Sequence, residues 1–94
     1  MDTKEKTITL EDVLSKNNLE RVSKLILWND DFNSFEWVIT CLISILKFNV
    51  ERAEKTAWEV HLKGKSIIKD GNFEDLTIYK ELLETAGLTL TIEK

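Results

Sequence analysis

The spacing of hydrophobic residues changes several times along the chain, and each change predicts a secondary-structure element. An apolar run at residues 25–28 stops at Asn29, which is typical of a short buried strand that ends in a turn. Apolar side chains then recur every three or four positions over 35–46, the spacing of one helix face. Either Asn33 or Ser34 can cap the first turn of this helix. The folded part is therefore expected to begin with a strand followed by a helix.

A second helix is predicted at residues 50–63, directly after the first. Asn49 stands at its N-cap position, and Gly64 follows where a left-handed residue ends many helices. Its apolar stripe consists of Val50, Ala53, Ala57, Val60 and His61. The next segment, KSIIK at 65–69, predicts a second strand.

The last third of the chain predicts one more helix and one more strand. Asn72 caps a helix over 73–86, and Gly87 ends it. Residues 89–93 alternate Thr with Leu or Ile, the pattern of a half-buried strand. The resulting fold class is an α+β sandwich of order βααβαβ. A three-stranded antiparallel sheet with three helices on one face would bury every apolar stripe.

The N-terminal segment differs from the rest because it is polar, charged and only weakly periodic. We expect residues 1–23 to be a flexible extension and residues 24–94 to form a single folded domain. Two interpretations of the extension stay open: a disordered terminus without a function, or a helical turn that binds a partner. The apolar residues available to such a turn are Leu10, Val13, Leu14 and Leu19.

Composition narrows the classes of function. Seventeen acidic against thirteen basic residues give a net charge of −4, whereas proteins that neutralise nucleic-acid phosphates concentrate Lys and Arg. One Cys and one His exclude an internal disulfide, a Cys-rich metal centre and an all-His zinc site. The N-terminus lacks the apolar core of a secretory signal, and the most apolar window, 35–48, is too short to span a bilayer. We therefore expect a cytoplasmic protein that binds neither nucleic acid nor a membrane.

Two sets of residues can carry chemistry, and each also has a purely structural interpretation. Asn29, Asp30 and Asp31 follow the first strand, where Asn and Asp commonly form turns by bonding nearby backbone N–H groups. The alternative is a cation-binding site made of two carboxylates and an amide. His61 lies on the apolar stripe of the second helix, where it is either a hydrogen-bonded core residue or a ligand-binding group.

The loop residues 29–31 and His61 are more informative when they are considered together. If the two helices pack as a hairpin beneath the first strand, Asn29, Asp31 and His61 converge on the mouth of one hollow. Its apolar walls would be Phe35, Val38, Ala57 and Val60. An apolar pocket with a few convergent polar groups is the usual form of a small-ligand site. A metal site is not expected, because one His is too few and the adjacent carboxylates of Asp30 and Asp31 tend to diverge.

Several short segments occur here in a characteristic order and spacing. They are LILWNDD at 25–31, FEWVI at 35–39, VERA at 50–53, and VH followed by GK within 60–65. Their combination resembles the ClpS adaptor family of the Clp ATP-dependent protease, and the resemblance covers residues 24–94. It implies the βααβαβ fold of that family, which is similar to the C-terminal domain of the ribosomal stalk protein.

The resemblance implies delivery of substrates rather than catalysis. Such adaptors bind proteins with a bulky hydrophobic N-terminal residue (Leu, Phe, Tyr or Trp) and bring them to the N-terminal domain of a ClpA- or ClpC-like AAA+ unfoldase. We expect this chain to act as a monomer and to need no cofactor. By the same resemblance, Asn29, Asp31 and His61 would bind the α-amino group, and Asp30 would brace the loop or meet the next backbone group.

The resemblance also assigns a side-chain pocket and a docking surface. The pocket residues would be Leu27, Asn33, Phe35, Val38, Ala57, Val60 and Leu88. Glu74 would contact the unfoldase, together with Tyr79 and Lys80 at the position where the family has a Lys.

This chain departs from the family pattern at three pocket positions. Ser34 replaces a Pro, Phe35 replaces a Met, and Ala57 replaces a bulky residue similar to Met. We expect Leu and aromatic N-terminal residues to be accepted and β-branched ones to be excluded, with their ranking left open. Two other classes of function stay open: a protein-docking domain of the same fold that does not hold an N-terminus, and a small enzyme or metal protein using Asp30, Asp31 and His61.

Overall fold

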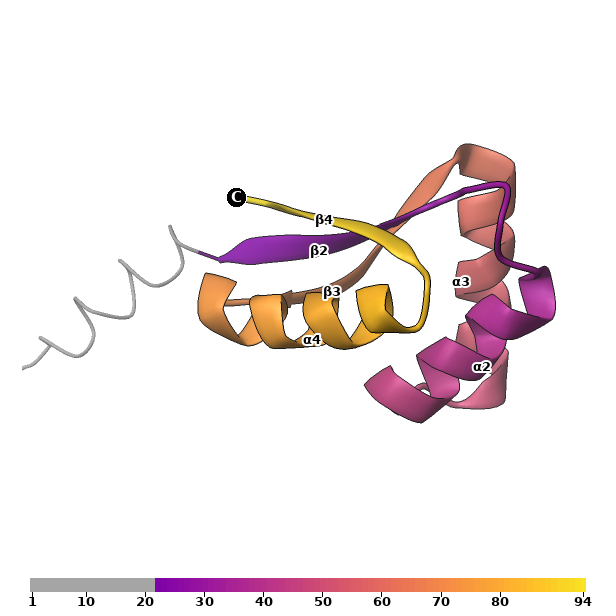
Figure 1. Ribbon diagram of the computed structural model, residues 1–94, viewed down its shortest axis with the longest axis horizontal. Helices are drawn as coiled ribbons and strands as arrows, with labels where there is room; N and C mark the ends of the chain where they lie inside the picture. The colour runs from indigo at the N-terminus through magenta and orange to yellow at the C-terminus, as the bar shows by residue number, and fades with distance from the viewer. Residues whose placement is uncertain (1–21) are drawn as a thin grey trace, which may run out of the picture.

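The computed structural model describes residues 22–94. The elements follow the predicted order βααβαβ (Figure 1). They are strand β2 (Ser23–Trp28), helices α2 (Phe35–Leu46) and α3 (Val50–Lys63), strand β3 (Lys65–Gly71), helix α4 (Phe73–Thr85) and strand β4 (Thr89–Glu93). None of the helices in this part of the chain combines the length and hydrophobicity that a bilayer crossing requires.

Strands β2 and β3 are each longer than their apolar runs predict. Strand β2 begins at Ser23, which we had placed at the end of the extension, and β3 continues to Gly71. These polar ends pair with each other, Ser23 opposite Gly71 and Lys24 opposite Asp70. Backbone hydrogen bonding therefore extends the ladder beyond the point where hydrophobic side chains mark it.

The sheet is antiparallel throughout, in the order β3-β2-β4. Strand β2 is thus the central strand, and its end at Trp28 lies between Lys65, which opens β3, and Thr89, which opens β4. The loop that leaves β2 consequently emerges beside both neighbouring strands.

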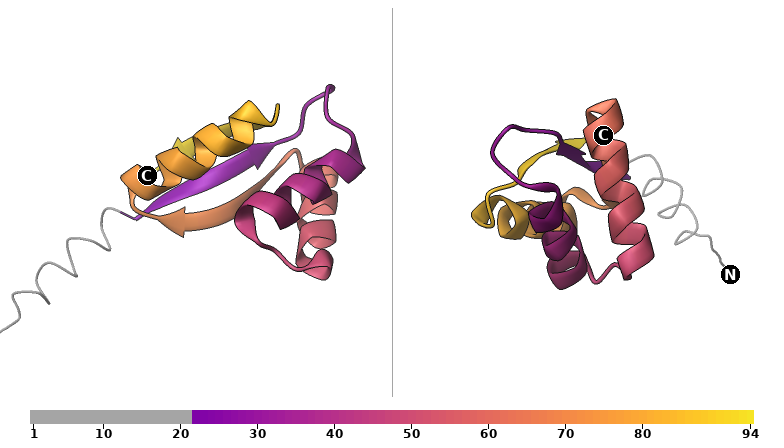
Figure 2. Two further views of the ribbon diagram at one scale, coloured as in Figure 1. Left: turned by 60° about the horizontal axis from the view of Figure 1, so that its bottom comes forward. Right: turned by 90° about the vertical axis from the view of Figure 1, so that its right-hand side faces the viewer.

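One face of the sheet carries the core, and all three helices contribute to it. Helix α4 runs along this face, while the α2–α3 hairpin packs across the end where β2 stops (Figures 1 and 2). The buried cluster takes residues from every element: Leu25, Leu27, Cys41, Leu42, Phe48, Ala53, Val60, Ile68, Leu76, Leu83, Leu88 and Leu90. This arrangement confirms the α+β class, and within residues 22–94 no helix covers the opposite face of the sheet.

The helix caps explain how the connections are fixed. Ser34, not Asn33, caps α2, since its hydroxyl accepts the Trp37 N–H at 3.0 Å. Asn49 and Asn72 cap α3 and α4 as predicted, each through its side-chain oxygen. In each of the three helices, one first-turn N–H group thus has a side-chain partner.

The end of α3 is held against the end of β2. Gly64 adopts φ +92°, a left-handed conformation that glycine tolerates best, and its N–H donates to the Val60 carbonyl. The Gly64 carbonyl in turn accepts the Asn29 N–H at 2.9 Å. This bond brings the last turn of α3, which carries His61, beside the first residue after β2.

Candidate functional site

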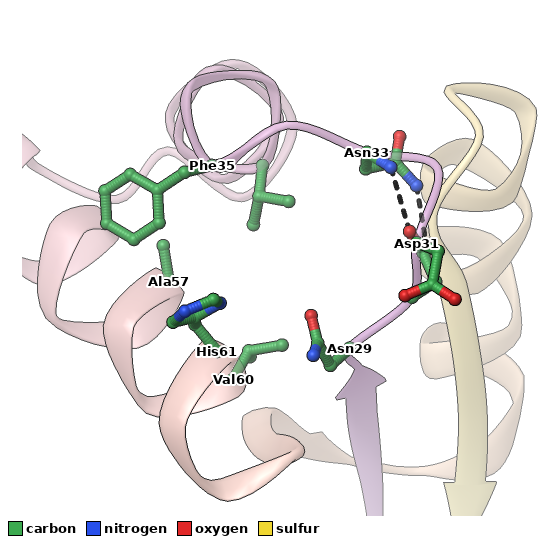
Figure 3. A pocket seen from close by; sticks show the side chains of 9 residues that line it. Asn29, Asp31, Asn33, Phe35, Ala57, Val60 and His61 are labelled. Carbon is green, nitrogen blue, oxygen red and sulfur yellow. Dashed lines mark hydrogen bonds between the residues drawn. The ribbon is translucent and has the colours of Figure 1, made fainter.

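A cavity of about 270 Å³ opens where β2, the loop after it, α2 and α3 meet (Figure 3). Its size is near the lower end of the range of small-ligand pockets. The described residues that line it include two carboxylates and no Lys or Arg: they are Asn29, Asp30, Asp31, Asn33, Phe35, Val38, Ala57, Val60 and His61. The structure therefore brings together the polar and apolar residues that the sequence separates by up to a third of the chain.

Asn29, Asp31 and His61, which we call the polar rim, surround the cavity mouth and are exposed to solvent. Asn29 and His61 face one another across the opening, from the end of β2 and from α3, and Asp31 lies on the loop beside Asn29 (Figure 3). Among the described residues, none bonds to these three side chains. An amide oxygen, a carboxylate and an imidazole are thus available to a cationic or hydrogen-bond-donating ligand.

Asp30 has a different environment from its neighbour. Its Oδ1 accepts the backbone N–H groups of Phe32 and Asn33, both at 2.9 Å. Its Oδ2 accepts Asn33 Nδ2 at 2.8 Å and the Thr89 hydroxyl at 3.1 Å. Burial alone would raise the pKa of the Asp30 carboxyl, but the bonds from Asn33, Phe32 and Thr89 together outweigh it and hold the pKa below its usual value.

Asn33 also connects the loop after β2 to the turn between α4 and β4. Its Nδ2 also donates to the Gly87 carbonyl at 2.8 Å. We call Asp30, Asn33, Gly87 and Thr89 the loop clamp. Nearby, Trp37 Nε1 donates to the Ala86 carbonyl at 2.9 Å and fixes the start of α2 to the same turn. The loop that presents Asp31 is therefore tied to a segment distant in sequence.

The apolar walls come from the two helices of the hairpin, as predicted. Phe35 and Val38 line the cavity from α2, and Ala57 and Val60 line it from α3. Leu27 and Leu88, which the resemblance also assigned to the pocket, do not line this cavity. They are 1% and 5% exposed and belong to the central core. The side chain of Leu27 lies on the core face of β2, which is the face that the helices cover.

Trp58 was not among the predicted pocket residues, yet it contacts two of them. Its ring lies 4.6 Å from the Phe35 ring and 5.9 Å from the His61 ring, between centroids. The only sequence signal is an apolar residue one turn before His61 on α3.

The three residues assigned to unfoldase contact all lie on α4, and Tyr79 and Lys80 border different grooves. Glu74 is exposed in the first turn of α4, and α4 begins at its end away from the α2–α3 hairpin (Figure 1). Tyr79 lies on the β3 side, where the Lys69 ammonium sits 4.9 Å from its ring. Lys80 borders a groove along β4 and pairs with Glu84 at 2.9 Å.

Residues 22–94 hold no group of three or more His, Cys, Asp or Glu side chains that is arranged to bind a metal ion. Within the cavity, Asp30 is committed to the loop clamp, which leaves the Asp31 carboxylate, the His61 imidazole and the neutral amide oxygen of Asn29 as candidate ligands. One carboxylate, one imidazole and one neutral amide make a weak donor set for a metal ion.

A model of the family described as "ATP-dependent Clp protease adaptor protein ClpS" matches residues 18–91. The chain belongs to the ClpS adaptor family. It is 38% identical over 68 residues to the ClpS adapter of Thermosynechococcus vestitus, an alignment that covers 71% of this chain and 72% of the relative. It is 29% identical over 83 residues to the ClpS adapter of Corynebacterium diphtheriae, covering 88% and 72%. Members of this family are adaptors of a protease, not proteases.

A solved structure confirms the fold. The structure of Agrobacterium tumefaciens ClpS2 bound to L-phenylalaninamide matches this chain with a TM-score of 0.68 and 20% sequence identity. The match covers 78% of this chain and 95% of that one. The ClpS fold therefore spans most of the part described here.

Proposed function

We propose that this adaptor binds proteins whose N-terminal residue is bulky and hydrophobic (Leu, Phe, Tyr or Trp) and delivers them to a ClpA- or ClpC-like AAA+ unfoldase. The observation that carries the proposal is the cavity, which combines apolar walls with an exposed polar rim whose side chains bond to no other described residue. Family membership and the fold shared with ClpS2, which was solved with L-phenylalaninamide, support it.

A free α-amino group fits the polar rim. It is a cation with three N–H donors, and Asn29 Oδ1, the Asp31 carboxylate and an imidazole nitrogen of His61 are matching acceptors. Charge-assisted hydrogen bonds contribute about 1.5–3 kcal/mol each. An acetylated or internal residue brings no positive charge and would leave these groups without a partner. The rim thus selects a chain terminus.

The apolar walls then select the side chain. Burying a Leu or Phe side chain contributes about 1.5–3 kcal/mol, and association costs offset part of the total. Affinity near the micromolar level, about −8 kcal/mol, is consistent with these contributions. Such affinity allows both selection and release. In this proposal Asp30 braces the loop and does not contact the amine, because both its oxygens already accept hydrogen bonds.

Delivery to the unfoldase uses the first turn of α4 in this proposal. Glu74 is exposed there, at the opposite end of α4 from the loop clamp, so cargo in the cavity leaves it accessible (Figure 1). The separate orientations of Tyr79 and Lys80 make Glu74 the residue to test first. Replacing Glu74 by Lys should weaken binding to a purified N-terminal domain of a Clp unfoldase. Glu81→Lys, an equal charge change at an exposed position of the same helix, should not.

The decisive experiment titrates fluorescently labelled peptides that differ only at the N-terminus. Peptides beginning with Leu or Phe should bind in the micromolar range by fluorescence anisotropy. The N-acetylated Leu peptide should bind at least about tenfold more weakly, the loss of one charge-assisted interaction. Binding should also weaken well above the α-amino pKa of about 7.7–8. Equal affinity for the acetylated peptide would exclude amine recognition and favour a general docking domain.

A further inference from the structure

Trp58 does not line the cavity, but its ring contacts two residues that do. Its ring packs against Phe35 at a tilt of 54° with centroids 4.6 Å apart, a distance of direct contact. It also meets the His61 ring edge to face, at 5.9 Å and 76°. One indole therefore contacts one residue of the apolar wall and one residue of the polar rim.

The position of these rings gives Trp58 a mechanical role. Phe35 is the first residue of α2, where no preceding helical turn restricts its side chain. Trp58 comes from α3, so the aromatic contact joins the two helices of the hairpin directly beside the opening. Trp58 itself is 51% exposed and lies outside the core cluster, so the fold does not depend on its burial.

We infer that Trp58 is a positioning residue that fixes the Phe35 ring and the His61 imidazole, and thereby sets which N-terminal side chains enter the cavity. The inference rests on the proposed recognition of N-terminal residues. Trp58 acts through its two neighbours and makes no contact with the bound residue.

The physical consequence concerns branching next to the backbone. When the α-amino group sits at the polar rim, the first side-chain atoms must pass the mouth beside Phe35. A ring held in place by Trp58 cannot turn aside for a second substituent on Cβ, as Ile and Val have. Leu and Phe branch one atom further along, inside the cavity. A fixed ring therefore discriminates Leu from Ile, and a free ring does so less.

The test compares two labelled peptides, identical except for an N-terminal Leu or Ile, on the full-length protein. Trp58→Ala should bind the Leu peptide about two- to tenfold more weakly, the effect of losing one aromatic pair. It should bind the Ile peptide as well as the wild type or better, so the ratio of the two affinities falls. Trp58→Phe should keep most of the ratio, because a ring remains. Leu62→Ala, at a 73% exposed position of α3, is the control and should change neither affinity.

Each outcome decides the inference. A wild-type protein that binds neither peptide overturns the proposed function together with the role of Trp58. A selective wild type whose Leu-to-Ile ratio survives Trp58→Ala overturns the role of Trp58 alone. Equal loss of both peptides also overturns it, because Trp58 would then contribute affinity without selectivity. Circular dichroism checks folding, and Trp58→Leu, which keeps apolar bulk without a ring, replaces the Ala variant if that variant unfolds.

Discussion

The loop clamp and the polar rim are neighbouring regions built from the same residue types. The clamp uses Asp30 and Asn33, whose side chains bond to each other, to the loop backbone and to the start of β4. The rim uses Asn29 and Asp31, which alternate with them along the chain and form no side-chain bond to any other described residue. The clamp makes the loop rigid, and the rim is thereby held at the cavity mouth.

This difference separates stability from binding. A carboxylate with four donors around it contributes to folding, since removing it leaves several N–H and O–H groups without a partner. An exposed carboxylate without a partner contributes little to folding and remains available to a ligand. Substitutions at Asp30 and Asp31 should therefore have different effects although the residues are adjacent and identical.

Asp30→Ala should have the largest effect on stability. It removes the acceptor of two backbone N–H groups, the Asn33 amide and the Thr89 hydroxyl, at a cost of about 2–3 kcal/mol in the free energy of unfolding. Urea unfolding followed by circular dichroism measures it. Asp30→Asn keeps one oxygen acceptor and should lose less. An unchanged urea midpoint for Asp30→Ala would show that the clamp does not hold the loop.

Asp31→Ala should leave the fold intact and weaken peptide binding. The expected loss is about 1.5–3 kcal/mol, or tenfold and more in the dissociation constant, with stability within about 0.5 kcal/mol of wild type. Asp70→Ala is the matched control, since it removes the same charge from an exposed position at the other end of the sheet. If both variants lose affinity equally, net charge and not the rim attracts the peptide.

Acidification should destabilise the protein more through the Asp30 carboxylate of the loop clamp than through other carboxylates. The folded-state pKa of Asp30 lies below its unfolded value, so its contribution is present above the unfolded pKa, about 3.9, and is lost as pH falls through the folded pKa. Between about pH 6 and pH 3, the urea midpoint of the wild type should fall more than that of Asp30→Asn. The Ser66 hydroxyl lowers the pKa of Glu59 at 2.6 Å, but this carboxyl is exposed, so Glu59→Gln should change the pH dependence less. Parallel pH profiles for the wild type and Asp30→Asn would contradict this prediction.

Lys47→Gly should have the smallest effect and a stabilising one. Lys47 ends α2 at φ +62°, the left-handed region in which glycine avoids a steric cost. We expect a gain of about 0.5–1 kcal/mol in urea unfolding. Lys47 belongs to neither the clamp nor the rim, so peptide affinity should not change. A changed affinity would show that the far end of α2 influences the cavity.

Local signals allowed much of the fold to be predicted. Asn49, Asn72 and Gly64 cap or end helices through bonds within a few residues, so the sequence pattern is sufficient. The choice between Asn33 and Ser34 cannot be predicted from the sequence, because both can cap a helix and the bonds that Asn33 makes instead, to Asp30 and to the distant Gly87 carbonyl, form only in the folded chain. For the same reason, the sequence does not reveal the role of Thr89, because its bond to Asp30 joins residues that are far apart along the chain.

The apolar part of the site shows the same limit. Phe35, Val38, Ala57 and Val60 follow from helix periodicity, which places them on facing sides of a hairpin. Leu27 and Leu88, which only the family resemblance assigned to the pocket, belong to the core cluster and do not line the cavity, and hydrophobicity alone does not distinguish a core residue from a cavity residue. The role of Trp58 is visible only from its contacts in the structure, because the sequence does not show which ring lies beside an exposed aromatic residue.

The bond from the Asn29 N–H to the Gly64 carbonyl has a further consequence for how the site comes into existence. It joins residues on either side of the whole α2–α3 hairpin and closes a long chain loop. Closing such a loop costs conformational entropy that only the completed β2–β3 ladder and core offset. A ligand that binds this rim only in the native state therefore stabilises the entire domain, by RT ln(1 + L/Kd), where L is the free ligand concentration.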